Sequence, residues 1–205
     1  MFENIRTEHI YYVTKDFYYA FRFFLVKYDG KPANIMLCNG YYLRYFRHEI
    51  LRSIDKSLWN VYVSDDYMPG YIGAFSYDYI NYALRGERHT LHHFLPDMKL
   101  PLIHVAILNV EDDGHIASLY PYHRILDSDK EFDIVDEFDY VAAPRLTVTP
   151  KKLNEIKELL LLVRPGMYKI EAANKVHPSI LDRLHKPAIF IYPAHHYCNN
   201  PNDEG

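Results

Sequence analysis

The chain has 205 residues, of which 49% are hydrophobic, and its 23 Lys and Arg against 27 Asp and Glu give a formal net charge of -4. This length suits one ordinary domain with its own core. Because no excess of positive charge is available, we expect neither nucleic acid nor an anionic membrane as a partner. The chain has no apolar run near the roughly 20 residues that span a bilayer. The start of the chain lacks the pattern of a secretory signal, so we expect a cytoplasmic location.

The first part of the chain predicts a short strand and then a helix. His9–Val13 is rich in strand-forming residues, and Asp16 can cap a helix that runs to Leu25. The turn residues Asp29–Pro32 then lead into an apolar run at Ala33–Leu37, which predicts a buried strand.

Hairpins are the expected connection in the middle of the chain. Asn39-Gly40 is a hairpin dipeptide, and it could pair Ala33–Leu37 with the strand formers of Tyr41–Phe46. Leu102–Val110 is the strongest strand candidate, and the turn Glu111–Gly114 could pair it with His115–Tyr120.

Between these hairpins the patterns are weaker. Leu58–Val63 predicts a short strand, and the glycine-containing aromatic stretch Tyr71–Ile80 predicts a bulge or a close approach of the backbone. Residues 85–101 are polar and rich in histidine, which indicates a loop.

An acidic segment and a helix are expected in the last third. Asp127–Asp139 carries seven acidic residues, so it predicts a linker or an exposed edge. Thr149 is a helix cap and Pro150 suits the first helical position, which predicts a helix to Val163 that Pro165-Gly166 ends. The expected fold is therefore α+β, with a mostly antiparallel sheet and flanking helices.

Side chains that could bind a metal or act as nucleophiles are present without the spacing that such sites require. His89, His92 and His93 lie close together, and His195-His196 stand beside Cys198, but neither group has the repeated spacing of a structural zinc site. Ser76 lacks the G-x-S-x-G elbow, and both phosphate-binding glycine motifs are absent. We therefore predict no metal site and no catalytic residue.

Three segments, in order, resemble component I of anthranilate synthase. Pro69–Asp78, followed by the turn Leu95-Pro96-Asp97 and the strand Ile103–Val110, is similar to the G-x-x-G-x-x-S-Y-[DE] region of its N-terminal domain. Thr149–Tyr168 is similar to the entry into its chorismate-binding domain, and Leu181–Phe190 to its L-R-x-x-N-P-S-P-Y-M-F stretch. The resemblance implies an N-terminal domain at residues 1–145 and the truncated start of a chorismate-binding domain at 146–192. Residues 193–205 match no segment of the family, and we expect them to form a disordered tail.

The resemblance also implies a function. The family's enzyme converts chorismate and ammonia to anthranilate and pyruvate, with Mg²⁺ and with a glutamine amidotransferase subunit as partner. Its catalytic and magnesium-binding segments have no counterpart before Gly205, so the chain is expected to carry the regulatory domain, to hold no cofactor and to be inactive without them. The alternatives are a fragment of aminodeoxychorismate synthase component I, or a noncatalytic amino-acid-sensing module that docks a partner through its many tyrosines.

An effector site for tryptophan or a related amino acid follows from the same resemblance. The family's L-L-E-S element falls on a segment that ends in Leu37 and Cys38, and its P-Y-M-F element on Pro187, Ala188 and Ile189. Leucine cannot accept a hydrogen bond from an ammonium group and a thiol is a weak partner, so feedback by tryptophan is expected to be weakened or altered. Cys38 could equally be a small buried core residue.

Overall fold

The computed structural model describes residues 8–14, 17–68, 70, 75–92, 98–137, 140–163 and 176–193. Its centre is a seven-stranded sheet in which every pairing is parallel. In the order of the sheet the strands are β1 (Ile10–Thr14), β10 (Ile189–Pro193), β9 (Glu158–Val163), β6 (Val105–Val110), β2 (Ala33–Leu37), β3 (Trp59–Val63) and β5 (Thr90–His92).

The strand order changes direction between β2 and β6. From β2 the chain proceeds outward through β3 to β5, and from β6 it proceeds the other way through β9 to β10. In open parallel sheets such a reversal leaves a crevice at the carboxyl ends of the two central strands. The edge of the sheet beside Leu37 and Val110 is therefore where a ligand site is expected.

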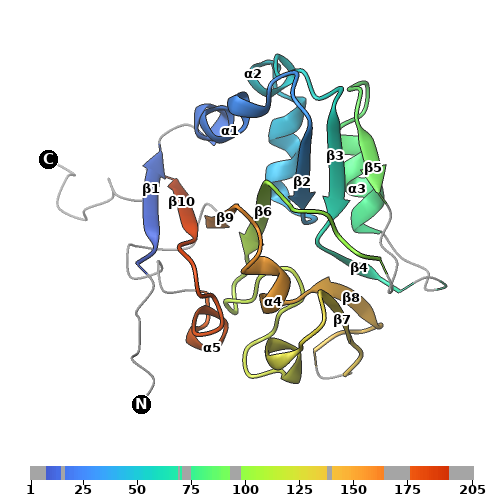
Figure 1. Ribbon diagram of the computed structural model, residues 1–205, viewed down its shortest axis with the longest axis vertical. Coiled ribbons are helices and arrows are strands. Elements are labelled where there is room, and N and C mark those ends of the chain that lie inside the picture. The colour runs from blue at the N-terminus through green and yellow to red at the C-terminus, as the bar shows by residue number, and fades with distance from the viewer. Residues whose placement is uncertain are drawn as a thin grey trace, which may run out of the picture.

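A second, three-stranded antiparallel sheet lies at the carboxyl end of β3. Its order is β4 (Asp65–Tyr67), β8 (Arg145–Val148) and β7 (Phe132–Val135). Because only Ser64 separates β3 from β4, the small sheet is held beside the carboxyl ends of β2 and β3 (Figure 1).

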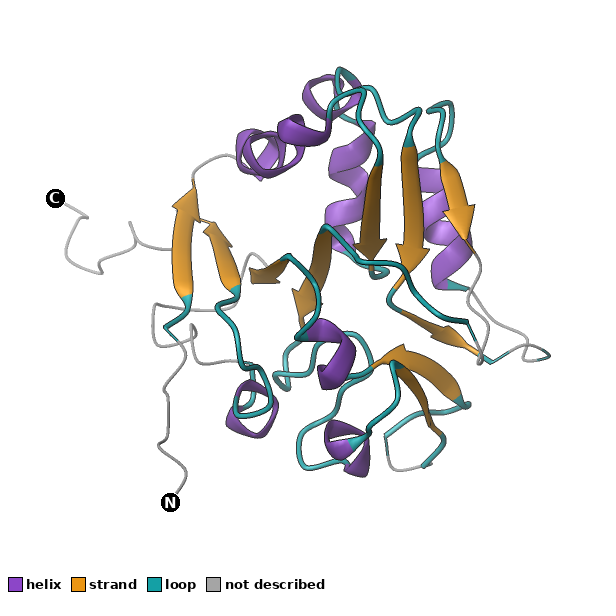
Figure 2. Cartoon of the chain, in the orientation of Figure 1, coloured by secondary structure: helices purple, strands orange, loops and turns teal. Residues whose placement is uncertain are grey.

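Helices surround the two sheets (Figure 2). Among the helices of the described residues, none is long and apolar enough to cross a bilayer. The α-helices are α1 (Phe17–Leu25), α2 (Glu49–Arg52), α3 (Ser76–Ala83), α4 (Pro150–Leu153) and α5 (Pro178–Leu181), and the 3-10 helices are Val26–Tyr28, Tyr41–Arg47 and Arg124–Asp127.

The expected mostly antiparallel α+β fold is wrong, because the apolar runs form a parallel sheet. All six residues of β6 are buried, and so are five of the six in β9. A strand covered on both faces reads as a continuous apolar run, whereas a strand with one wet face alternates. The predicted hairpin after Val110 is reduced to single bridges, Val110 with Ile116 and Ile116 with Leu119, while β6 pairs with β2 and β9.

The helix predicted from Pro150 to Val163 ends early. Thr149 caps it as expected, since its hydroxyl accepts from the Lys152 backbone N–H, but α4 stops at Leu153. The leucines that follow form β9 between β6 and β10. The spacing of Leu153, Ile156 and Leu160 suits a helix. Burying the leucines as a strand between β6 and β10 stabilises the chain more than that helix would.

The hairpin predicted through Asn39-Gly40 is also wrong. Tyr41–Arg47 is a 3-10 helix, and β2 pairs with β3 and β6 instead. Four residues of this helix are buried, namely Tyr42, Leu43, Tyr45 and Phe46, so its aromatic content reflects core packing rather than a strand.

The stretch Tyr71–Ile80 ends in the helix α3, and Gly73, where a bulge or a close approach of the backbone was expected, lies outside the described residues. The carboxylate of Asp66, only 1% exposed, accepts from the backbone N–H groups of Ser76 and Tyr77 and so caps α3. Ser76 is thereby a helix-start residue. Residues 71–74 lie outside the described residues.

Other expectations are met in part. The helix to Leu25 and the strands at Ala33–Leu37 and Leu58–Val63 are confirmed, whereas Asp16 lies outside the described residues. The expected loop at 85–101 contains the short strand β5. The acidic segment provides β7, an edge strand of the small sheet, and it buries Phe132 and Val135.

Strands on both sides of the boundary expected between residues 145 and 146 belong to one sheet. β9 and β10 follow that boundary and pair with β6 and β1, which precede it. From residue 194 onward, the tail expected to be disordered lies outside the described residues.

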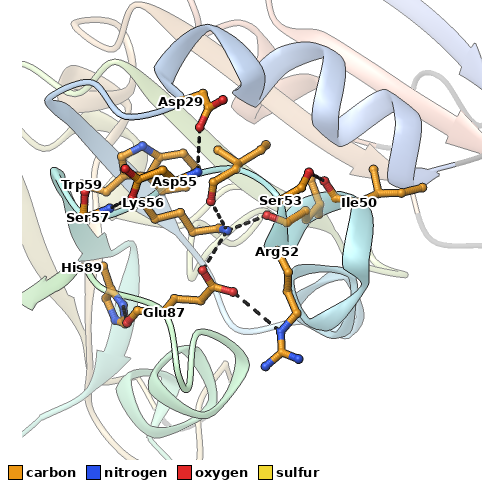
Figure 3. A network of polar contacts seen from close by, with 12 residues as sticks. Asp29, Ile50, Arg52, Ser53, Asp55, Lys56, Ser57, Trp59, Glu87 and His89 are labelled. Atoms are coloured by element: carbon orange, nitrogen blue, oxygen red, sulfur yellow. Dashed lines mark hydrogen bonds and ion pairs between the residues drawn. The ribbon is translucent and has the colours of Figure 1, made fainter.

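A buried ammonium group fixes the loop that leads into β3 (Figure 3). The side chain of Lys56 is fully buried, and its Nζ donates to the carbonyl oxygens of Leu51 at 2.6 Å and Ile54 at 2.9 Å. It also donates to Glu87 Oε2 at 3.3 Å and lies 5.8 Å from the centre of the Trp59 ring. Burial lowers the pKa of this ammonium group, and Glu87 opposes the shift.

Replacing Lys56 by methionine tests this cluster. The change keeps an unbranched side chain of similar length but leaves the Ile54 carbonyl without its donor and the Leu51 carbonyl with the Ile54 backbone N–H alone, so we expect unfolding to become easier by about 2 kcal/mol. Thermal and urea unfolding would measure the loss. Lys31→Met, at an exposed lysine, is the matched control. An unchanged midpoint for Lys56→Met would show that the cluster contributes nothing to stability.

Candidate functional site

A cavity of about 220 Å³ lies at the reversal of the strand order. It is lined from β2 by Cys38 and Asn39, which directly follow that strand, and from β6 by Asn109. Asp65 of β4 and Arg145 of β8 line it from the small sheet. Pockets of this kind, at the carboxyl ends of parallel strands, are the usual ligand sites of such sheets.

The turn after β6 carries a histidine into this cavity. Gly114, with a φ of +86°, closes a turn in which its N–H donates to the Glu111 carbonyl at 2.9 Å. A positive φ suits glycine, so the turn requires it here. The Glu111 N–H in turn donates to the His115 carbonyl at 3.0 Å, which places His115 in the cavity wall.

The His115 ring is held by a carboxylate and an aromatic ring. Its Nδ1 lies 2.6 Å from Asp113 Oδ1, and the centre of the Tyr120 ring lies 4.6 Å away. The same Asp113 oxygen accepts from the His115 backbone N–H at 3.1 Å. With Nδ1–H donating to the carboxylate, Nε2 is left as the acceptor of the neutral ring.

Next to the histidine, a buried carboxylate gathers three donors. Asp65, 5% exposed, accepts from the hydroxyls of Ser64 at 2.8 Å and Ser118 at 2.9 Å and from Arg145 Nη2 at 2.6 Å. The Ser118 hydroxyl also accepts from Arg145 Nε at 2.8 Å. The Asp65 cluster, as we call these four residues, thus joins the end of β3 to β8 and to the segment after His115.

Arg145 is the one lysine or arginine among the described residues that line the cavity. Burial disfavours its charged form, but the Asp65 carboxylate outweighs burial and keeps the pKa of the guanidinium above its ordinary value. The guanidinium carbon also lies 4.4 Å from the centre of the Tyr67 ring. Arg145 is therefore a fixed positive charge in the wall.

Between His115 and the Asp65 cluster the backbone is strained. Ala117 has a φ of +51°, a region that non-glycine residues rarely adopt, and it also lines the cavity. Ile116 beside it is fully buried and bridges both Val110 and Leu119. The buried isoleucine and the strained alanine turn the chain so that His115 and Ser118 both face the cavity, and such strain is often found at functional sites.

The ends of β2 and β6 are locked together on the other side of the cavity. Asn109 donates its backbone N–H to Cys38 Sγ at 3.2 Å and its Nδ2 to the Asn39 carbonyl at 3.2 Å. A Cβ atom on Gly40 would lie 1.6 Å from Asn109 Nδ2, so the close approach requires glycine. Tyr42 donates to the Cys38 carbonyl at 2.8 Å and fixes the same corner.

The Cys38 thiol is not set up as a nucleophile. Burial raises its pKa, and the nearby Asp65 carboxylate adds to the shift. Because the thiolate is the reactive form, Cys38 serves here as a hydrogen-bond acceptor and packing residue.

The residues predicted to bind an amino-acid effector are not brought together. Leu37 and Cys38 lie at the carboxyl end of β2, whereas Pro187, Ala188 and Ile189 lie at the start of β10, with β6 and β9 in between. In a parallel sheet these two ends are at opposite edges. Of the five residues, only Cys38 lines the cavity.

The histidine clusters singled out in the sequence make separate contacts. His89 Nδ1 lies 3.0 Å from the Glu87 carbonyl, and His92 stacks on Tyr62 and hydrogen bonds to Asn60. His93, His195, His196 and Cys198 lie outside the described residues. Within the described part of the chain, no three His, Cys, Asp or Glu side chains come together to hold a metal ion.

Apart from Cys38, the residues that form the cavity were not among the candidates predicted from the sequence. A signal was available at Asp113-Gly114-His115, which directly follows the strongest strand, because the carboxyl end of a buried parallel strand is where ligands bind. Because that turn was interpreted as the loop of a hairpin, a ligand site at the end of the strand was not predicted. Asp65 and Arg145 carry no local signal, because they meet only in the folded chain.

Comparison with known proteins identifies the family. Residues 78–198, more than half of the chain, match the family described as glucosamine-6-phosphate isomerases/6-phosphogluconolactonase. A 6-phosphogluconolactonase from Synechocystis is 32% identical over 93 residues, which cover 45% of this chain. The aligned segment spans 38% of the length of that relative.

Solved structures show the same fold over nearly the whole chain. The 6-phosphogluconolactonase from Thermotoga maritima has a TM-score of 0.66 and 18% identity over 90% of this chain and 100% of its own. The enzyme from Trypanosoma brucei has a TM-score of 0.68 and 13% identity over 91% of this chain and 97% of its own.

These findings overturn the resemblance to anthranilate synthase. The family match and the parallel sheet show that the chain is not a chorismate-utilising enzyme, so tryptophan biosynthesis, a lyase activity and the sister aminodeoxychorismate synthase are excluded as well. No glutamine amidotransferase partner is indicated, and the expectation of tryptophan as effector falls with the family. The motifs misled because short Gly, Pro and Ser-Tyr-Asp patterns also mark turns and helix starts, as Ser76 does in α3.

Gly40→Ala tests the contact between the ends of β2 and β6. The added methyl group collides with the Asn109 side chain, so we expect a loss of about 1–3 kcal/mol in unfolding free energy. In an Asn109→Ala background the colliding atoms are gone, and the loss should largely disappear. Urea unfolding of the two single variants and the double variant would measure this coupling. Equal losses in both backgrounds would contradict the contact.

Proposed function

Since the chain belongs to the glucosamine-6-phosphate isomerase/6-phosphogluconolactonase family, we propose that it hydrolyses the cyclic ester of a sugar acid, as a 6-phosphogluconolactonase does. The observation that carries the proposal is the pairing of His115 with Asp113 in the wall of the cavity. The sequence similarity to the Synechocystis enzyme supports the lactonase activity within this family. The cytoplasmic location expected from the sequence goes with this proposal.

Lactone hydrolysis requires a base that removes a proton from water. With Nδ1 held by Asp113, His115 Nε2 can accept that proton while the water oxygen bonds to the carbonyl carbon. The Asp113 carboxylate stabilises the imidazolium ion that forms. When the ring C–O bond breaks, the imidazolium ion returns the proton to the leaving oxygen, so the products are a carboxylic acid and a hydroxyl group.

Negative charge develops on the carbonyl oxygen as water adds, and Arg145 provides the positive charge in the cavity. Its guanidinium is held by Asp65, Ser118 and Tyr67, so it does not have to reorganise during the reaction. We propose that Arg145 attracts the carbonyl oxygen of the substrate as it becomes negative, or an anionic group elsewhere on the substrate.

His115→Gln should lower kcat for lactone hydrolysis by about 10²–10⁴-fold, because glutamine cannot act as a base. The rate would be measured by proton release with 6-phosphogluconolactone and with glucono-δ-lactone, after subtraction of the uncatalysed reaction. His89→Gln, at a histidine remote from the cavity, is the matched control. A wild-type chain that hydrolyses neither lactone, or a His115→Gln variant with full activity, would refute the proposal.

Asp113→Ala should have a smaller effect, because it removes the residue that orients the base and leaves the base itself. We expect kcat to fall by an intermediate factor and KM to change little. His115→Gln should then add less in the Asp113→Ala background than in wild type, since the two residues act together. Independent, multiplying effects would contradict the pairing.

A further inference from the structure

One residue that lines the cavity carries a buried polar atom without a partner. Asn109, the fifth residue of β6, is 4% exposed and lines the cavity, and its Oδ1 makes no hydrogen bond within the described part of the chain. Buried side-chain oxygens are almost always hydrogen bonded, so an exception calls for an explanation.

The amide of Asn109 cannot resolve this by rotating. Its Nδ2 donates to the Asn39 carbonyl at 3.2 Å, and a flipped side chain would place two oxygens against each other. The backbone on either side is fixed as well, since the Asn109 N–H is bound to Cys38 Sγ. Oδ1 is therefore fixed in position as a hydrogen-bond acceptor that has no donor among the described residues.

The other groups in the wall favour a ligand that donates. Glu111 contributes carboxylate oxygens, which accept hydrogen bonds, and the Asp65 carboxylate beside it already accepts from three donors. Among the donors of the wall, the Nε and Nη2 of Arg145 and the hydroxyl of Ser118 are already bound within the Asp65 cluster. A molecule with several hydroxyl groups matches a wall rich in acceptors.

We propose that Asn109 Oδ1 accepts a hydrogen bond from a hydroxyl group of the substrate, and that Asn109 is therefore a residue that selects polyhydroxylated lactones over lactones without hydroxyl groups. The identification of the ligand as a lactone rests on the proposed function. The acceptor role of Asn109 rests on the unpartnered oxygen.

Binding of two neutral lactams separates the two ideas. Gluconolactam carries the hydroxyl groups of glucono-δ-lactone, δ-valerolactam carries none, and neither is readily hydrolysed. By titration calorimetry we expect wild type to bind gluconolactam at least tenfold more tightly than δ-valerolactam. Asn109→Ala should weaken gluconolactam binding by about tenfold, the usual effect of one hydrogen bond, and leave δ-valerolactam binding unchanged.

The matched control is Asn34→Ala. Asn34 lies near the amino end of β2. Its Nδ2 donates to the Leu102 carbonyl and its Oδ1 accepts from Asn60 Nδ2, so this variant loses side-chain hydrogen bonds away from the cavity. Should Asn109→Ala fail to fold, the side-chain amide resonance of Asn109 in wild type gives a second readout. It should shift with gluconolactam and not with δ-valerolactam.

Equal affinity of wild type for the two lactams, or equal weakening of both in Asn109→Ala, would overturn the inference and would show that Oδ1 is satisfied by water. Selective loss of gluconolactam binding supports it. Failure to hydrolyse any lactone alongside selective gluconolactam binding would reject the proposed function and leave the acceptor role of Asn109 standing. Lactone hydrolysis without selective gluconolactam binding would support the proposed function and reject the acceptor role of Asn109.

Discussion

The candidate site depends on one buried negative charge, that of Asp65. A carboxylate with 5% exposure is costly unless donors surround it, and here two hydroxyls and a guanidinium do so. Those donors come from the end of β3, from the segment that follows His115 and from β8, so satisfying the charge brings three distant parts of the chain to one point. The wall of the cavity is a consequence of that requirement.

The parallel sheet determines where this wall can stand. Because β2 and β6 run in the same direction and the chain leaves them toward opposite sides, their carboxyl ends leave a space that the connections do not fill. Cys38, Asn109 and His115 all follow or end these strands. The small sheet closes the space from the side and supplies Arg145.

Elements that depend on interactions between neighbouring residues could be predicted from the sequence, and those that depend on contacts between distant residues could not. Local signals were sufficient for α1, for β2 and for the cap at Thr149, because a turn, an apolar run or a capping hydroxyl acts within a few residues. Leu160–Val163 could not be assigned in the same way, since an apolar run suits a helix and a doubly buried strand equally until the neighbouring strands are known. His115 stood beside the best strand, but its importance depends on whether that strand is parallel, and Asp65 and Arg145 meet across 80 positions of sequence.

The position of β1 has a consequence for how the chain folds as it is synthesised. Among the described strands, β1 pairs only with β10, from Ile10 beside Ile189 to Thr14 beside Pro193, and Figure 1 shows the two lying side by side at one edge of the sheet. During synthesis, β1 can pair only after a strand made nearly 180 residues later has left the ribosome. Until then its tyrosines have no sheet to join, so the nascent chain exposes an aromatic strand while the residues between β1 and β10 are made, and this edge of the sheet is completed only after β10.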